Sequence, residues 1–181
     1  MYTIKPRLRP SRQRAIQGLC LAGVLAAAPP ARSADEPDGE RRNWFDDPFI
    51  QATSAMPGCP VPDAPLLTQE QMRREAHYRA ERGTSCFQAG RCRLPNAYLY
   101  DKEIASRVLK AITVDGRFAD TSVWIEGQRR WVWLKGCVAR AEQKQALEQL
   151  VRAIDDVEAV IEQLQVGTGA TPPPYRTAPP R

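Results

Sequence analysis

Apolar and other residues alternate at strand spacing through the stretch Val132-Trp133-Leu134-Lys135-Gly136-Cys137-Val138. The apolar residues after this stretch change to helix spacing, at Leu147, Leu150, Val151 and Ile154. A strand that leads into an amphipathic helix indicates a compact unit with both kinds of element. Following the same pattern in both directions places that unit at residues 100–166.

An amphipathic helix is predicted at the start of this unit. Asp101 suits the N-cap position, and Asp115-Gly116 ends the helix. Its apolar stripe consists of Ile104, Val108, Ala111 and Ile112. A first strand follows, in which Trp124 points to the side opposite Val123 and Ile125.

The strand at residues 131–138 returns after a short polar turn at residues 127–130, so the two strands should be antiparallel. Val132, Leu134 and Val138 face the helices, and Trp131, Trp133, Lys135 and Cys137 face away. A second helix over residues 140–153 is followed by a third strand with an inward row of Val160, Leu164 and Val166. The predicted fold class is α+β with the order αββαβ: two helices packed on one face of a three-stranded mixed sheet.

The first 33 residues look like a secretory signal peptide. Basic residues precede a mostly apolar run at residues 15–28, and Ala31-Arg32-Ser33 offers small residues before a cut at Ala34. A membrane anchor would need about 20 apolar residues, and Cys20 lacks the small and aliphatic residues that precede a lipoprotein cysteine. We therefore predict cleavage before Ala34 and a periplasmic location.

Removal of this leader changes the charge of the chain. The leader holds six of the 26 lysines and arginines and none of the 21 acidic residues, which leaves 20 basic residues and a net charge of −1. Such a balance gives no reason to expect a nucleic-acid partner. Any anionic partner would have to be recognised by local basic clusters.

Four cysteines remain in the mature chain: Cys59, Cys86, Cys92 and Cys137. An even number in an exported chain favours disulfide bonds, whereas the wide spacings and the single histidine disfavour a zinc site. Three pairings are possible. Cys137 lies on the face that bears the tryptophans, so a bond to it would draw the N-terminal arm across that face. We favour Cys59 with Cys137 and Cys86 with Cys92. The alternatives bond Cys137 to Cys86 or to Cys92, or leave Cys137 as a free thiol with the tryptophan face open to a partner or a membrane.

The N-terminal arm, residues 34–99, begins with charged residues that are predicted to be flexible. Its proline-rich segment at residues 48–65 is predicted to be extended. Thr68-Gln69-Glu70-Gln71 then fits a capping box that begins a short helix, which Gly83 ends. This helix is expected to pack by Met72, Ala76 and Ala80, with its arginines in solvent or bound to an anionic partner. At the other end of the chain, the proline-rich tail at residues 167–181 is predicted to be disordered.

The strand stretch belongs to a longer pattern. Val132-x-Leu134-x-Gly136-x-Val138, then Leu150, and then Val157-x-x-Val160-x-x-x-Leu164-x-Val166 resemble the BON domain. Gly136, between two apolar strand positions, is the most telling residue of this resemblance. That domain occurs in exported bacterial proteins, including osmotically inducible periplasmic proteins and outer-membrane lipoproteins.

The chain departs from the family pattern at two positions: Arg130 stands where members often have glycine, and Glu162 where they often have asparagine. The four cysteines are also outside the pattern. The resemblance implies a non-enzymatic periplasmic module, in envelope maintenance or stress response, that associates with phospholipid surfaces. A related lineage builds rings in secretion complexes, so the alternative is a protein–protein interaction or assembly module.

No catalytic residue, cofactor site or metal site is predicted. The sequence offers no Ser, His and Asp set and no glycine-rich phosphate loop, and His77 stands alone on a basic helix. The candidates for contact with lipid or a partner protein are Arg129, Arg130, Trp131, Trp124, Trp133 and Lys135. Arginine beside tryptophan suits a membrane interface, although the arginines could simply solvate the turn. The sequence determines neither the class of partner nor the oligomeric state.

Overall fold

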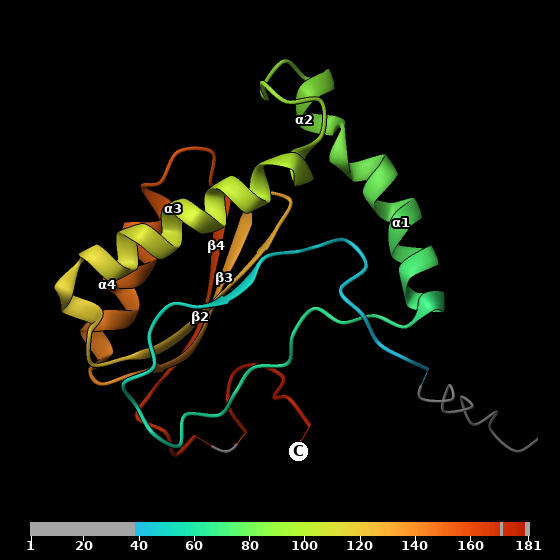
Figure 1. Cartoon of the computed structure of the whole chain (residues 1–181). Coiled ribbons are helices and arrows are strands. Elements are labelled where there is room, and N and C mark those ends of the chain that lie inside the picture. Colours follow the sequence, from blue (N-terminus) through green and yellow to red (C-terminus); the bar gives the residue numbers. More distant parts are fainter. Residues whose placement is uncertain (1–38, 171, 180–181) are drawn as a thin grey trace, which may run out of the picture. The chain divides into compact units, whose positions relative to one another are not determined.

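The computed structural model describes residues 39–170 and 172–179. The predicted leader and its cleavage site before Ala34 lie outside the described residues. Within the described part, a four-stranded sheet carries two helices on one face, so the predicted α+β class is confirmed (Figure 1).

The strands follow the order β1-β2-β3-β4 across the sheet. β2 (Ser122–Gln128) and β3 (Trp131–Val138) form the predicted antiparallel hairpin, and β4 (Ala159–Val166) runs parallel to β3. The sequence analysis did not predict β1 (Phe49–Gln51), which comes from the arm and pairs antiparallel with β2. A strand of three residues at a sheet edge shows no alternating pattern, and prolines nearby do not prevent it.

Two helices, α3 (Asp101–Val114) and α4 (Ala141–Arg152), cover the inner face of the sheet (Figure 1). Short 3₁₀ helices, η1 (Ala97–Tyr100) and η2 (Gly116–Phe118), flank α3. The buried core between the layers consists of Tyr100, Ile104, Val108, Ile112, Phe118, Val123, Ile125, Val132, Leu134, Val138, Leu147, Val151, Val160 and Leu164. Of the predicted inward strand residues only Val166 is misplaced: it is the last residue of β4 and is 51% exposed.

Gly136 is required by the close approach of β2. Its φ is +126°, and a Cβ at this position would lie 2.1 Å from the carbonyl oxygen of Ser122. The glycine that supports the family resemblance therefore has a structural reason. The other notable family position, Glu162, forms an ion pair of 3.2 Å with Lys144 of α4.

The arm helix α1 (Gln69–Gly83) begins and ends at the predicted residues. Thr68 and Gln71 form the capping box, because each side chain accepts a hydrogen bond from the other residue's backbone N–H. A single further turn, α2 (Ser85–Gln88), lies in the cysteine loop. The charged start of the arm, predicted to be flexible, is ordered where it is described. Trp44 Nε1 donates to the carbonyl of Leu67 at 2.7 Å, and the backbones of Arg42 and Leu67 form an antiparallel β-bridge.

The predicted packing side of α1 is wrong. Ala76 and Ala80 are exposed, whereas Arg79 and Gly83 are buried. A buried arginine needs a partner for its charge, even on a helix whose sequence predicts exposure to solvent. That partner lies in the arm itself, at Asp47.

The outer face of the sheet is divided into a covered half and an open half. Cys59 is bonded to Cys137, with their Cα atoms 5.9 Å apart. These cysteines pack with Trp124, which is 7% exposed, and with Phe49 and Met56 of the arm. On this half the arm covers the sheet and forms a second small core, whereas Trp131 and Trp133 at the hairpin end stay partly exposed.

The second disulfide joins Cys86 to Cys92, with Cα atoms 5.3 Å apart. The predicted disulfide bonds are thus present, in the pairing that the sequence favours. They use all four cysteines of the arm and the sheet.

The prediction of a disordered tail is wrong for residues 172–179. Tyr175 is 7% exposed, and its hydroxyl donates to the carbonyl of Pro60 at 2.8 Å. Thr177 forms a bridge with Pro62 of the arm. One aromatic residue among prolines is enough to anchor the tail beside the Cys59–Cys137 bond, since the Tyr175 oxygen lies 3.9 Å from Cys59 Sγ.

Candidate functional site at the β2–β3 hairpin

The two-residue turn between β2 and β3 has an unusual backbone for its residues. Arg129 and Arg130 have φ values of +54° and +65°. Tight hairpin turns of this kind normally use Asn-Gly or Asp-Gly, because larger side chains are strained at positive φ. The turn therefore depends on contacts from outside the hairpin.

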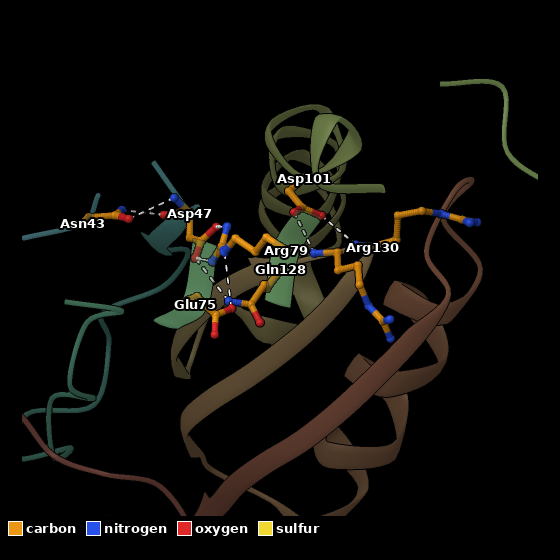
Figure 2. A network of polar contacts seen from close by, with 8 residues as sticks. Asn43, Asp47, Glu75, Arg79, Asp101, Gln128 and Arg130 are labelled. Atoms are coloured by element: carbon orange, nitrogen blue, oxygen red, sulfur yellow. Dashed lines mark hydrogen bonds and ion pairs between the residues drawn. The ribbon is translucent and has the colours of Figure 1, made fainter. Parts of the chain in front are cut away.

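Asp101 supplies these contacts. Its Oδ2 accepts the N–H of Arg129 at 2.7 Å. Its Oδ1 accepts the N–H of Arg130 at 2.6 Å (Figure 2). Only 3% of Asp101 is exposed. The prediction that Asp101 caps α3 is wrong: η1 runs directly into α3, so Tyr100 holds the N-cap position and the carboxylate is free to clamp the turn.

Arg79 of α1 reaches the same end of the sheet. Its guanidinium binds both carboxylate oxygens of Asp47, with Nη1 and Oδ1 2.8 Å apart (Figure 2). Gln128 of β2 donates to the same carboxylate at 3.3 Å. The ring centres of Phe45 and Tyr98 lie 3.9 and 4.5 Å from the guanidinium carbon of Arg79. The side chains of Arg79 and Asp47 are only 10% and 7% exposed, so a buried ion pair attaches the arm helix at the hairpin.

Three of the six candidate contact residues make their contacts within the protein. Arg130 donates to Cys92 Sγ at 2.9 Å, and its side chain is 16% exposed. Lys135 forms a half-buried ion pair of 2.6 Å with Glu126. Trp124 lies under the arm. These side chains hold the hairpin, the sheet and the arm together.

The other three candidates, Arg129, Trp131 and Trp133, line a cavity of about 270 Å³. The Arg129 guanidinium carbon lies 5.2 Å from the Trp131 ring centre, and the two tryptophan rings are 6.1 Å apart. The remaining lining residues come from α1, η1 and β2: Glu75, Tyr78, Arg82, Tyr98 and Gln128. We call this cavity the hairpin pocket.

Sequence reasoning missed the part that α1 plays in the hairpin pocket. Arg82 is one of several helix arginines that could meet an anionic partner, but nothing in the local pattern shows which of them faces the hairpin. Tyr78 and Tyr98 carry no sequence signal of a site, and the role of Asp101 is hidden by its resemblance to a helix cap.

A model of a known protein family matches the folded unit that contains this hairpin. Residues 100–168 match the family model of the BON domain. This part of the chain is a BON domain. The match confirms the resemblance seen in the sequence, and this non-catalytic family points to an exported, envelope or membrane-associated protein. A comparison with curated proteins found no match.

The hairpin pocket crosses the boundary of the BON domain. Arg129, Trp131 and Trp133 belong to the domain, whereas Tyr78 and Arg82 precede it on α1. The arm thus supplies one wall of the pocket. Across residues 39–170 and 172–179, no helix has the length and apolar character needed to cross a membrane.

The clamp aspartate of the BON domain has a raised pKa. Burial disfavours the charged form and raises the pKa of Asp101 from 3.8 to about 6. The hydrogen bonds from the backbone N–H groups of Arg130 and Arg129 lower this pKa, but their effect is smaller than that of burial. The carboxylate of Asp47 raises this pKa further, and the guanidinium of Arg79 lowers it. The folded protein therefore binds a proton at Asp101 more tightly than the unfolded chain does.

This shift predicts that Asp101 stabilises the fold in acid. Its contribution is complete below the unfolded pKa of 3.8 and is lost as the pH rises through about 6. The free energy of unfolding of the wild type, minus that of Asp101→Asn, should increase by about 2 to 3 kcal/mol from about pH 7 to about pH 4 in urea denaturation. Asp120→Asn is the control with the opposite sign, because hydrogen bonds from Gln143 and Arg140 lower the pKa of Asp120. A pH-independent difference for Asp101→Asn would contradict the raised pKa.

Proposed function

We propose that this chain is a non-enzymatic periplasmic BON-domain protein that associates with phospholipid surfaces of the cell envelope through its hairpin. The observation that carries the proposal is the pairing of Arg129 with Trp131 at the hairpin end. Among the described residues, no carboxylate forms an ion pair with Arg129, whose guanidinium lies 5.2 Å from the Trp131 ring centre. A guanidinium pairs with lipid phosphate and an indole ring favours the interface, so the two suit one membrane surface.

The rigidity of the turn supports this proposal. Asp101 accepts both backbone N–H groups of the turn, so Arg129 is presented without the loss of backbone freedom that a flexible loop would incur on binding. The expected signal peptide at residues 1–33 agrees with a periplasmic location. The BON domain agrees with a role in envelope maintenance.

Cosedimentation with vesicles of phosphatidylglycerol and phosphatidylcholine tests the proposal. Replacing Arg129 by glutamine should weaken binding about fivefold, because one basic residue near an anionic surface contributes about 1 kcal/mol. The matched control is Lys110→Gln, which removes the same charge from an exposed position on α3, in the helix layer. Binding by the control should stay close to that of the wild type, and salt should weaken binding by the wild type.

Failure of the wild type to sediment with anionic vesicles at low salt would contradict the membrane proposal. The open half of the sheet's outer face would then favour the alternative, a module that binds or assembles with another envelope protein. If Arg129→Gln and Lys110→Gln weakened vesicle binding equally, the protein would be attracted to the anionic vesicles by its charge without a defined contact surface.

A further inference from the structure

We infer that the hairpin pocket binds a single phosphate group between Arg129 of the BON domain and Arg82 of the arm helix. The inference deepens the proposed membrane function and rests on it for the physiological source of the phosphate, a lipid headgroup. The phosphate of a soluble ester has the same chemistry, so the experiment separates the two sources.

The charges that line the pocket favour an anion. Arg82 and Arg129 contribute two guanidiniums, and neither has an ion-pair partner within residues 39–170 and 172–179. The lining includes one carboxylate, Glu75, which lies 3.3 Å from Nε of the buried Arg79 and is directed to that charge. The pocket is therefore left with two positive groups, one on each wall.

Aromatic rings hold both guanidiniums in place. The Arg82 guanidinium carbon lies 4.1 Å from the ring centre of Tyr78, and that of Arg129 lies 5.2 Å from the ring centre of Trp131. Contact with a ring face orients a guanidinium but leaves the N–H groups at its edge available. These N–H groups match the oxygens of a phosphate in a bidentate arrangement.

A third donor belongs to the same lining. The indole Nε1 of Trp131 is buried and has no hydrogen-bond partner within the described part of the chain. A buried donor without a partner is costly, so a shift of the indole ring that brought Nε1 to an oxygen of a bound anion would remove this cost.

The size of the pocket suits a headgroup. Its volume of about 270 Å³ lies below the roughly 300 to 1,000 Å³ of pockets that take drug-sized ligands. A phosphate with its neighbouring polar atoms fits this space better than a whole lipid does. The acyl chains would stay outside, in the membrane that the hairpin contacts.

The first part of the experiment uses inorganic phosphate as the probe. Nuclear magnetic resonance signals of the arginine Nε–H groups and of the Trp131 indole N–H are followed as phosphate is added at constant ionic strength, with acetate as the control anion. We expect a saturable shift of the signals of Arg82, Arg129 and Trp131. Arg82→Gln and Arg129→Gln should each weaken phosphate binding about tenfold or more. The matched control is Arg73→Gln, at an exposed position on the same helix and outside the pocket, which should bind as the wild type does.

The second part repeats the vesicle assay with the same variants. Loss of vesicle binding in Arg82→Gln but not in Arg73→Gln supports a lipid headgroup in the pocket. If the wild type does not bind vesicles but shows the saturable phosphate response, the pocket is a site for a soluble phosphate ester and the proposed membrane function is wrong. If vesicles bind wild type and Arg82→Gln equally and phosphate gives no saturable shift, the membrane function stands and the pocket inference is overturned. Equal weakening by Arg73→Gln and Arg82→Gln would also overturn it.

Discussion

A chain in which alanine replaces both Cys59 and Cys137 is expected to lose about 4 kcal/mol of its free energy of unfolding. The bond joins residues 78 positions apart, and a crosslink over so long a loop removes much of the conformational freedom of the unfolded chain. Urea denaturation followed by tryptophan fluorescence measures the loss, since Trp124 packs against this disulfide. The arm and the docked Tyr175 should loosen together, because both lie against Cys59.

The second disulfide provides the matched control. Cys86 and Cys92 are separated by 6 positions, so replacing both by alanine should cost only about 2 kcal/mol in the same measurement. The difference between the two double variants isolates the effect of loop length. Equal losses, or a larger loss for the short loop, would contradict the argument.

The Cys59–Cys137 bond also shows how far local pattern predicts this fold. The alternation around Leu134 and Gly136 reveals which residues face the helices, and therefore that Cys137 shares the outer face with the tryptophans. Strand and helix periods are properties of neighbouring residues, so the two faces, the hairpin and the helix layer follow from the sequence. The expected arm crossing follows from the same reasoning, because a disulfide requires its two backbones to approach closely.

Contacts between distant segments are hidden from such reasoning. Tyr175 is one aromatic residue in a proline-rich tail, and its partner Pro60 is more than 100 positions away. The sequence predicts that Asp101 caps a helix, but its carboxylate accepts hydrogen bonds from the backbone N–H groups of Arg129 and Arg130 in the turn. In each case the local pattern fits a common structure, whereas the fold uses the side chain elsewhere.

The candidate site could be predicted only in part for the same reason. The pairing of Arg129 with Trp131 is a local feature of the hairpin, so the sequence identifies it. The second wall of the hairpin pocket comes from α1, whose position depends on Asp47 and Arg79. Nothing in the helix pattern indicates that one of its arginines is buried.

Replacing Arg79 by methionine is expected to lower the free energy of unfolding by about 3 to 5 kcal/mol. Methionine preserves the apolar stem, but it leaves the Asp47 carboxylate, 7% exposed, without its guanidinium. Gln128 then remains as a neutral donor at 3.3 Å, which cannot compensate a buried charge. Urea denaturation at neutral pH measures the loss.

Two further variants show whether the charge itself is responsible. Asp47→Asn combined with Arg79→Met removes both charges and should recover most of the loss, because the cost comes from one buried charge left alone. Arg74→Met, on the same helix, breaks an exposed ion pair with Glu70 and should cost less than about 0.5 kcal/mol. Losses of the same size for Arg79→Met and Arg74→Met would mean that the Asp47 pair is solvated and that α1 is anchored by other contacts.

The Arg79→Met variant also links the arm to the hairpin pocket. The guanidinium of Arg79 lowers the pKa of Asp101, so its removal should raise that pKa further and shift the acid stabilisation to higher pH. Because α1 carries Arg82 and Tyr78, its release should abolish the phosphate response while residues 100–168 stay protected from hydrogen exchange. Loss of protection throughout the BON domain instead would show that the arm and the domain fold as one cooperative unit, with the ion pair as part of its core.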